Sequence, residues 1–338
     1  MDPVTHALAS LTLGKAGLAR ATRLAMPMLV VAGVAGDADW LSVYSGPAAF
    51  LRWHRTATDS LVGAAAIAII VAGIFTLFAR GRPDPPVSFP RALLVSGIAA
   101  YVHVLLDWTN SYGVYLLWPF RQTWYAGDLL PPVDIWLLGV LVIGLAVPWV
   151  FRLATEEIGA RAKRPGFSYA ATPVLIIAVL YAGWRWEQHR RALTLLRTPL
   201  FHGEVVLGAG AFPGATSLFT WSGVVDTQNT LDTVQVGLLF QNEFDPLNAR
   251  VLYKPEPSPE LAAARATQTA ATFLSFARFP WAEVEKSSTG SRVVITDLRF
   301  DQAAPSSHQV SAVIELNAQG QVVAQGLHFG PVASALDE

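Results

Sequence analysis

The first half of the chain contains histidine and aspartate residues of the kinds that bind metal ions. Neutral imidazole and carboxylate groups together suit Zn, Mn or Fe. His103 and Asp107 are four residues apart in an apolar run, so on a helix they lie on one face, about one turn apart. Asp37 and Asp39 are two apart, which suits a helix end that turns into a loop. These spacings indicate a divalent-metal site, for which zinc is the first choice and Mn or Fe the alternatives.

Further histidines and aspartates fall near the ends of other apolar segments, at the same expected side of a membrane. Ionisable groups near lipid depth are costly and usually face a cavity or a partner. The predicted metal ligands are His6, Asp37, His54, His103 and Asp107. Asp39, Asp59 and Asp134 are predicted to act as further ligands, as partners that orient the ligands, or as a general base. Arg55 and Arg121 would bind a substrate anion or, as an equal alternative, lipid headgroups.

Metal ions held in this way would activate water and polarise a phosphoryl or carbonyl group. The sequence therefore predicts a hydrolase of an ester or phosphoester. The chain has no cysteine, which excludes thiolate zinc sites and cysteine nucleophiles. It also has neither a nucleophile-elbow motif nor a P-loop. Two alternatives stay open: a transporter or metal-binding channel, because such residues also mark ion pathways, and a structural or interaction protein.

Residues 1–198 are predicted to be a polytopic membrane bundle of about six helices, which makes the chain mostly α. Only 14% of the residues of the whole chain are charged and 52% are hydrophobic. Residues 60–78 alone form an uncharged run of nineteen, long enough to cross a hydrocarbon core of about 30 Å. The expected helices are residues 5–18, 24–36, 60–78, 92–106, 135–151 and 167–184.

The basic residues of the bundle suggest its orientation. Ten lysines and arginines fall on one side of the six helices and seven on the side of the histidines, so the positive-inside rule places the histidines outside the cytoplasm. We expect the N-terminus to be retained, because Asp2 stands where a signal peptide would be basic. The expected location is a bacterial inner membrane, among its lipids, with residues 199–338 outside the cytoplasm. No nucleic-acid partner is predicted.

Residues 199–338 are predicted to be a soluble α+β domain. The first 200 residues hold 17 basic and 11 acidic side chains, whereas the rest hold 7 and 14. Short alternating segments rich in β-branched or aromatic residues predict strands at 218–225, 233–240, 292–300, 310–316 and 321–329. Ser258 and Pro259 predict the start of one helix that runs to about Ala277. Residues 317–320 predict a hairpin turn.

Several motifs of the membrane half occur together: Thr5-His6, residues 36–39, His54-Arg55 with Asp59-Ser60, and residues 103–107. Residues 109–113 with 118–120 form the longest piece, and Asp128 and Asp134 follow. Together they resemble the YdjM/YbcI-type family of inner-membrane proteins, which are regarded as metal-dependent hydrolases. The resemblance covers the membrane half and, more loosely, the region around Trp221 and the C-terminal strands.

The resemblance implies metal-dependent hydrolysis and a remote relation to the group of zinc-dependent phospholipase C and P1 nuclease. That relation would favour cleavage of a phosphoester, including a lipid one. One position departs from the family pattern, because Asp59 stands where a second histidine is expected. A carboxylate there can still bind a metal, but it would change the metal preference or the number of ions, or lie outside the ligand set.

Overall fold

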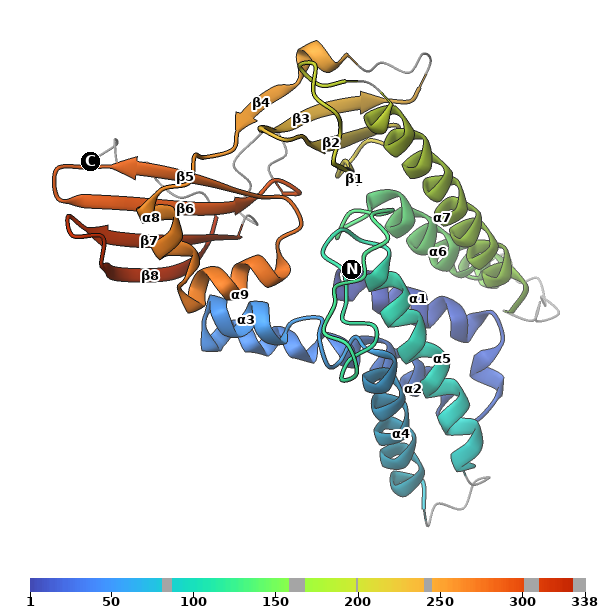
Figure 1. Ribbon diagram of the computed structural model, residues 1–338. Helices are drawn as coiled ribbons and strands as arrows, with labels where there is room; N and C mark the ends of the chain where they lie inside the picture. Colours follow the sequence, from blue (N-terminus) through green and yellow to red (C-terminus); the bar gives the residue numbers. More distant parts are fainter. Residues whose placement is uncertain (81–86, 158–167, 199, 240–244, 301–309, 331–338) are drawn as a thin grey trace. The chain divides into compact units, whose positions relative to one another are not determined.

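The computed structural model describes residues 1–80, 87–157, 168–198, 200–239, 245–300 and 310–330 (Figure 1). It divides into two compact units. We call Met1–Trp40 with Arg55–Glu187 the helical unit, and Leu41–His54 with Gln188–Glu338 the sheet unit. Each is described by itself.

The helical unit contains most of the long helices. They are α1 (Pro3–Lys15), α2 (Ala25–Val34), α4 (Leu61–Phe78), α5 (Phe89–Trp108), α6 (Ile135–Glu157) and α7 (Ser168–Arg197), which continues into the sheet unit. Two 3₁₀ segments, η1 (Leu18–Arg20) and η2 (Ala35–Ser45), follow α1 and α2. The six helices expected from the sequence correspond to these six α-helices, although residue 167, the expected start of the last, lies outside the described residues.

Among the described residues, three segments are long and apolar enough to cross a membrane: Ala25–Ser45, Leu61–Phe78 and Phe89–Trp108. A shorter apolar helix spans Ile135–Val150. The structure therefore agrees with a membrane part, whereas the number of six spanning helices stays a prediction.

Polar side chains fix where the helices begin. Asp2 caps α1 by accepting a hydrogen bond from the Thr5 N–H at 3.0 Å, and Ser60 caps α4 by accepting one from the Gly63 N–H at 2.8 Å. Such caps satisfy N–H groups that have no partner within the helix. Because Ser60 is hydrogen-bonded to the first turn of α4, it holds the residues just before that helix in place.

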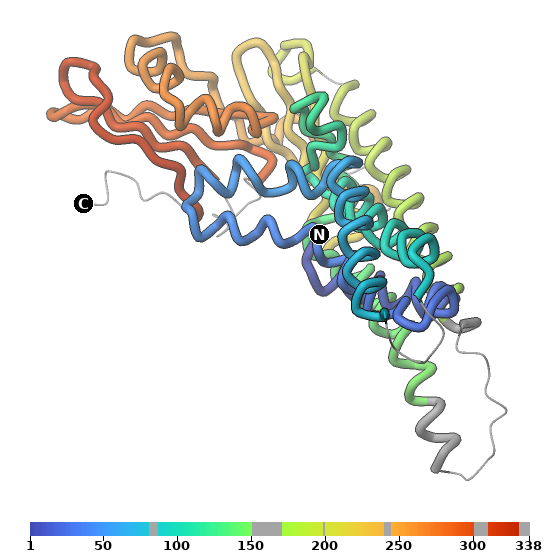
Figure 2. The backbone as a smooth tube through the Cα atoms, turned by 90° about the horizontal axis from the view of Figure 1, so that it is seen from below, coloured from blue at the N-terminus to red at the C-terminus, as the bar shows by residue number. Residues whose placement is uncertain are grey.

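Helices α2, α4 and α5 pack side by side, as Figures 1 and 2 both show. Their common core contains Met28, Leu29, Val71 and Val95, all of which are buried. Helix α1 packs closely on α2. Gly33 permits this approach, because a Cβ there would overlap the Ser10 hydroxyl. This close packing brings the start of α1, the end of α2 and the end of α5 to one place.

The sheet unit contains two antiparallel sheets, each with its strands in sequence order. The first is β1 (Gly208–Pro213), β2 (Thr220–Asp226), β3 (Thr230–Gly237) and β4 (Arg250–Tyr253), and the second is β5 (Pro280–Lys286), β6 (Gly290–Asp297), β7 (Val310–Asn317) and β8 (Val322–Phe329). Helices α8 (Pro259–Arg265) and α9 (Gln268–Phe276) lie between them in the chain. The broad prediction of an α+β domain is confirmed.

Several details of this domain differ from the expectation. The single helix predicted after Ser258 is two helices, because the Thr267 side chain accepts a hydrogen bond from Ala270 N and caps a new helix. Strands β1, β4 and β5 were not predicted, and the expected end at residue 240 lies outside the described residues. The turn at 317–320 is confirmed, since Asn317 Oδ1 accepts hydrogen bonds from the N–H groups of Gln319 and Gln321.

Residues Leu41–His54 were expected within the membrane bundle but belong to the sheet unit. Their helix α3 (Pro47–Trp53) contacts α9 and β8. Phe50 meets the ring of Phe329 edge-on, with ring centroids 5.5 Å apart. The sheet unit thus combines a segment inserted early in the chain with the residues from Gln188 onward, whereas the sequence predicted one boundary near residue 198.

Candidate metal centre

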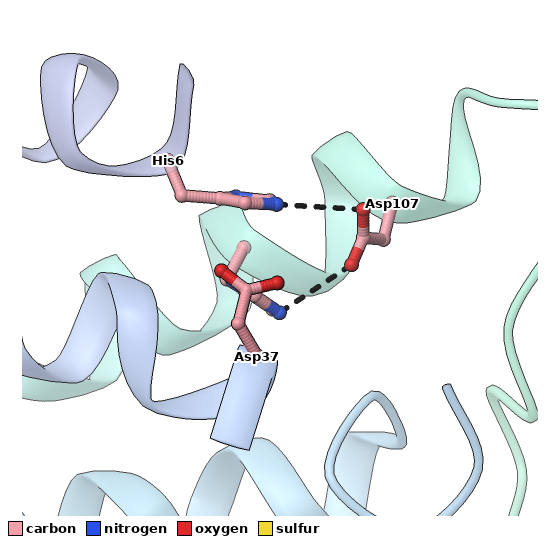
Figure 3. Close-up of side chains that lie close together, drawn as sticks. His6, Asp37 and Asp107 are labelled. Carbon is pink, nitrogen blue, oxygen red and sulfur yellow. Dashed lines mark ion pairs between the residues drawn. The ribbon is translucent and has the colours of Figure 1, made fainter. Parts of the chain in front are cut away.

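Four of the five predicted metal ligands lie together in the helical unit. His6 of α1, Asp37 of η2, and His103 and Asp107 of α5 each offer a ligand atom, and these atoms all lie within 4.8 Å of one another. Figure 3 shows His6, Asp37 and Asp107 with their side chains directed toward one another. Three of the four are buried and Asp37 is half-buried. The structure therefore brings four of the five predicted ligands together at one place.

Helix α5 supplies two of the four groups from one face, as their spacing predicted. His103 Nε2 lies 3.4 Å from Asp107 Oδ2. His6 Nε2 lies 3.4 Å from Asp107 Oδ1, and the His6 and His103 rings stack with centroids 3.9 Å apart. Asp107 is thus the point at which the two imidazoles converge.

The orientation of His103 is fixed by a backbone carbonyl. His103 Nδ1 lies 2.9 Å from Gly33 O. A carbonyl only accepts, so Nδ1 carries the proton in this contact. Nε2 presents its lone pair when the ring is neutral and donates to Asp59 when the ring is protonated. Metal-binding histidines are commonly held in this way, with the other ring nitrogen donating to a carbonyl.

Asp59 adds a third carboxylate to this place. Its Oδ1 lies 3.0 Å from His103 Nε2, and the residue is buried. Asp59 immediately precedes the cap of α4, so the loop before that helix positions it. The residue that departs from the family pattern is therefore in direct contact with a predicted ligand.

Gly36 makes room for His103. A Cβ at this position would overlap the His103 ring, with the ring atom Cε1 only 2.8 Å away. Any larger residue would force the imidazole to move. The glycine beside Asp37 is thus required by a close approach of side chain to backbone, a role that the sequence did not reveal.

The donor set of the site fits a divalent metal ion. Both ring nitrogens of His6 and Oδ2 of Asp37 are buried without a hydrogen-bond partner in the described part of the chain. His103 Nε2 faces the carboxylates of Asp59 and Asp107. Buried polar atoms normally have partners, and a cation bound between imidazole and carboxylate groups would supply one here.

Arg55 is a buried cation next to these carboxylates. Its Nη2 lies 3.2 Å from Asp107 Oδ1, the atom that the amino group of Met1 also contacts. Burial lowers the pKa of the Arg55 guanidinium, yet arginine stays protonated in proteins. Arg55 therefore brings a permanent positive charge to the site, at a position where the sequence predicted a substrate-binding residue.

The remaining predicted site residues lie in other settings. Asp39 Oδ2 accepts hydrogen bonds from Arg55 N at 2.6 Å and Thr58 Oγ1 at 2.8 Å, which holds the loop before α4. Asp134 accepts bonds from Trp136 N, Leu137 N and the Tyr181 hydroxyl at the start of α6. Neither belongs to the group of four. Arg121 is exposed.

His54, the fifth predicted ligand, belongs to the sheet unit. It is buried there, and its ring stacks on Phe50 with centroids 4.4 Å apart. The group of four does not include it. The sequence also missed Asn110, a buried residue hydrogen-bonded to Arg55; its only signal was its place in the longest matching motif.

Comparison with known proteins identifies the family. The model of the YdjM inner membrane protein family matches residues 1–192. The chain belongs to this family. Membership and the three apolar helices both fit a location in a membrane. The matched residues contain all four members of the metal-binding group.

The uncharacterized protein YfhP of Bacillus subtilis (strain 168) is a distant relative of this YdjM-family chain. It is 25% identical over 187 residues, which are 52% of this chain and 52% of YfhP. The chain therefore spans about half the length of this relative. No solved structure matches the chain, so the remote relation to phospholipase C and P1 nuclease stays a prediction.

Proposed function

We propose that this YdjM-family protein is a metal-dependent hydrolase of an ester or phosphoester, with a membrane lipid as one candidate substrate. The observation that carries the proposal is the setting of His103. Its Nδ1 is engaged with Gly33 O at 2.9 Å, while its Nε2 faces Asp59 and Asp107. One imidazole nitrogen and the two carboxylates that it faces offer three ligand atoms to a cation, and zinc is the first choice for this mixture of ligands.

His6, Asp37, His103 and Asp107 would hold the ion. When bound, a divalent ion lowers the pKa of coordinated water and polarises the ester oxygen. Asp59, which touches His103, would accept a proton from the attacking water as a general base. Asp39 and Asp134 would support the site by fixing the loop before α4 and the start of α6.

The side of the membrane is a further part of the proposal. The excess of lysine and arginine at the opposite ends of the helices favours a metal centre that faces away from the cytoplasm. The sheet unit would then be extracytoplasmic as well. A substrate from the outer leaflet could reach the centre without crossing the bilayer.

The test is metal analysis of the purified full chain in detergent after exposure to zinc. We expect bound zinc in the wild type and in the control His328→Asn, which changes an exposed histidine of β8. We expect loss of zinc in His103→Asn and Asp107→Asn, because each removes a ligand. Hydrolysis of a phospholipid and of a soluble phosphodiester should be lost in the same two variants.

Two results would contradict the proposal. Zinc retained by a His103→Asn/Asp107→Asn double variant would show that the metal binds elsewhere. Bound zinc without hydrolysis, together with zinc flux into proteoliposomes, would instead support a transporter.

A further inference from the structure

Two buried hydrogen-bond donors next to the metal centre find no acceptor in the part of the chain that the structure describes. They are the Nε–H of Arg55 and the Nδ2 amide of Asn110, and neither has a partner among the described residues. Arg55 is 5% exposed and Asn110 is fully buried. A buried donor without a partner is costly, so two adjacent ones indicate that something else completes their hydrogen bonds.

The orientation of the Asn110 amide is fixed by its oxygen. Asn110 Oδ1 accepts hydrogen bonds from Arg55 Nη1 at 2.7 Å, from Tyr112 N at 2.9 Å and from Gly113 N at 3.4 Å. A flipped amide would place donors against these donors. Nδ2 is therefore the end without a partner, and it can only donate.

The Arg55 guanidinium is held on several sides. Nη1 donates to Asn110, Nη2 pairs with Asp107 at 3.2 Å, and the plane lies over the Tyr112 ring at 5.1 Å. Nε is left without a partner. The side chain is thus rigid before any ligand arrives, which lowers the entropic cost of binding one.

The chemistry of these donors favours an anion with several oxygens. A divalent ion held by Asp107 would lie only one carboxylate away from Arg55, so one ligand with several negative oxygens would contact both cations. Water can satisfy an N–H group but brings no net charge. A phosphoryl group offers negative oxygens, and arginine matches its geometry well.

We propose that Arg55 and Asn110 form an anion subsite of the metal centre that binds the phosphoryl group of a phosphate ester. This inference rests on the proposed hydrolase function and narrows its substrate class, because a neutral carboxylic ester offers these two donors no negatively charged oxygen. In the reaction, the water oxygen forms a bond to phosphorus and the bond from phosphorus to the alcohol oxygen breaks. The proton of the water passes to the leaving alcohol.

The test measures ligand binding in the zinc-loaded full chain. The probes are inorganic phosphate and a short-chain phosphatidylglycerol, with acetate as the carboxylate control. The key variant is Asn110→Asp, which keeps an acceptor for Arg55, Tyr112 and Gly113 but replaces the donor with a negative oxygen. We expect phosphoryl binding to weaken about 10- to 100-fold, the usual effect of losing a charged hydrogen bond, with zinc content and unfolding temperature retained.

A second variant and a control keep the result interpretable. Arg55→Lys keeps the charge but loses the Nε–H, so phosphoryl binding should weaken there also. Arg91→Gln, an exposed residue at the other end of α5, should bind like the wild type. Tighter binding of the lipid or of inorganic phosphate identifies which source of the phosphoryl group fits.

The outcomes separate the two proposals. If zinc binds but neither phosphoryl probe does, if acetate binds as tightly as phosphate, or if Asn110→Asp binds like the wild type, the anion subsite is wrong and the hydrolase proposal stands. If no zinc binds, the hydrolase proposal fails, and the inference that narrows it fails with it.

Discussion

One buried ionic group in each unit shows how differently the chain can complete the hydrogen bonds of such groups. In the sheet unit, Arg299 Nε donates to Asp297 Oδ2 at 2.7 Å and Arg299 Nη2 donates to Phe276 O at 2.8 Å. The guanidinium also lies over the rings of Phe276 and Phe300, at 4.5 and 4.9 Å from their centroids. Asp297 in turn accepts hydrogen bonds from backbone N–H groups, including those of Arg278 and Phe279. Here the chain itself supplies the partners.

In the helical unit the buried set is incomplete. His6 and Asp37 have ligand atoms, and Arg55 and Asn110 have donors, without hydrogen-bond partners in the described residues. A completed ion pair holds a fold together but binds nothing, whereas an incomplete set needs a partner from outside the chain. Whether a buried ionic group has all its hydrogen-bond partners within the chain therefore distinguishes a structural ion pair from a candidate binding site better than burial alone does.

The largest expected effect comes from breaking the complete pair. Arg299→Met leaves Asp297 buried without its counter-ion and should destabilise the sheet unit by about 3–5 kcal/mol. Urea unfolding of the full chain, followed by hydrogen exchange of β5–β7, measures this loss. The double variant Arg299→Met/Asp297→Asn removes both charges and should recover part of the stability. A loss below about 1 kcal/mol in the single variant would mean that the pair contributes little.

The elements that the sequence predicted well are those fixed by local chemistry. The uncharged run was sufficient to predict α4, which Ser60 caps in the structure, and the four-residue spacing of His103 and Asp107 placed both on one face of α5. Asn317 and Gly320 predicted their turn because the side chain and the positive φ act within four residues. Each of these features depends on neighbours in the chain.

The features that the sequence missed depend on contacts between distant segments. Nothing local in residues 41–54 shows that Phe50 packs against Phe329, so the sequence assigned this segment to the membrane bundle. Asn110 gains its importance from Arg55, which lies 55 positions earlier in the chain. Gly36 matters only because His103 approaches it. When distant segments form a site, the residue types predict that a site exists. They do not predict which of those residues lie in it.

A smaller effect is expected from filling the space beside the incomplete set. Gly36→Ala places a methyl group against the His103 ring and should weaken zinc binding about 10- to 100-fold, as loss of an orienting contact does. Gly73→Ala is the matched control, because a Cβ there meets nothing within 4 Å. That control should bind zinc normally and gain up to about 1 kcal/mol of stability. Equal zinc affinity in the two variants would show that zinc binding does not depend on the position of the His103 ring.

The smallest effect is expected at a surface ion pair of the sheet unit, in which Lys286 is exposed and Glu260 is half-buried. Lys286 Nζ lies 2.8 Å from Glu260 Oε1, and its hydrogen bond lowers the pKa of Glu260 to about 2. Because this pKa is lower than that of the unfolded chain, about 4.3, the pair stabilises the fold above that pH and loses its contribution as the pH falls toward 2.

Glu260→Gln should therefore lower the unfolding temperature slightly at pH 7, and the difference from the wild type should vanish near pH 2. Glu283→Gln, at an exposed position of β5, controls for the loss of one negative charge. Solvent screening keeps such exposed pairs weak. If Glu260→Gln destabilised the fold as much as Arg299→Met does, this expectation would be wrong. Burial and complete hydrogen bonding would then not explain why one ion pair stabilises the fold more than another.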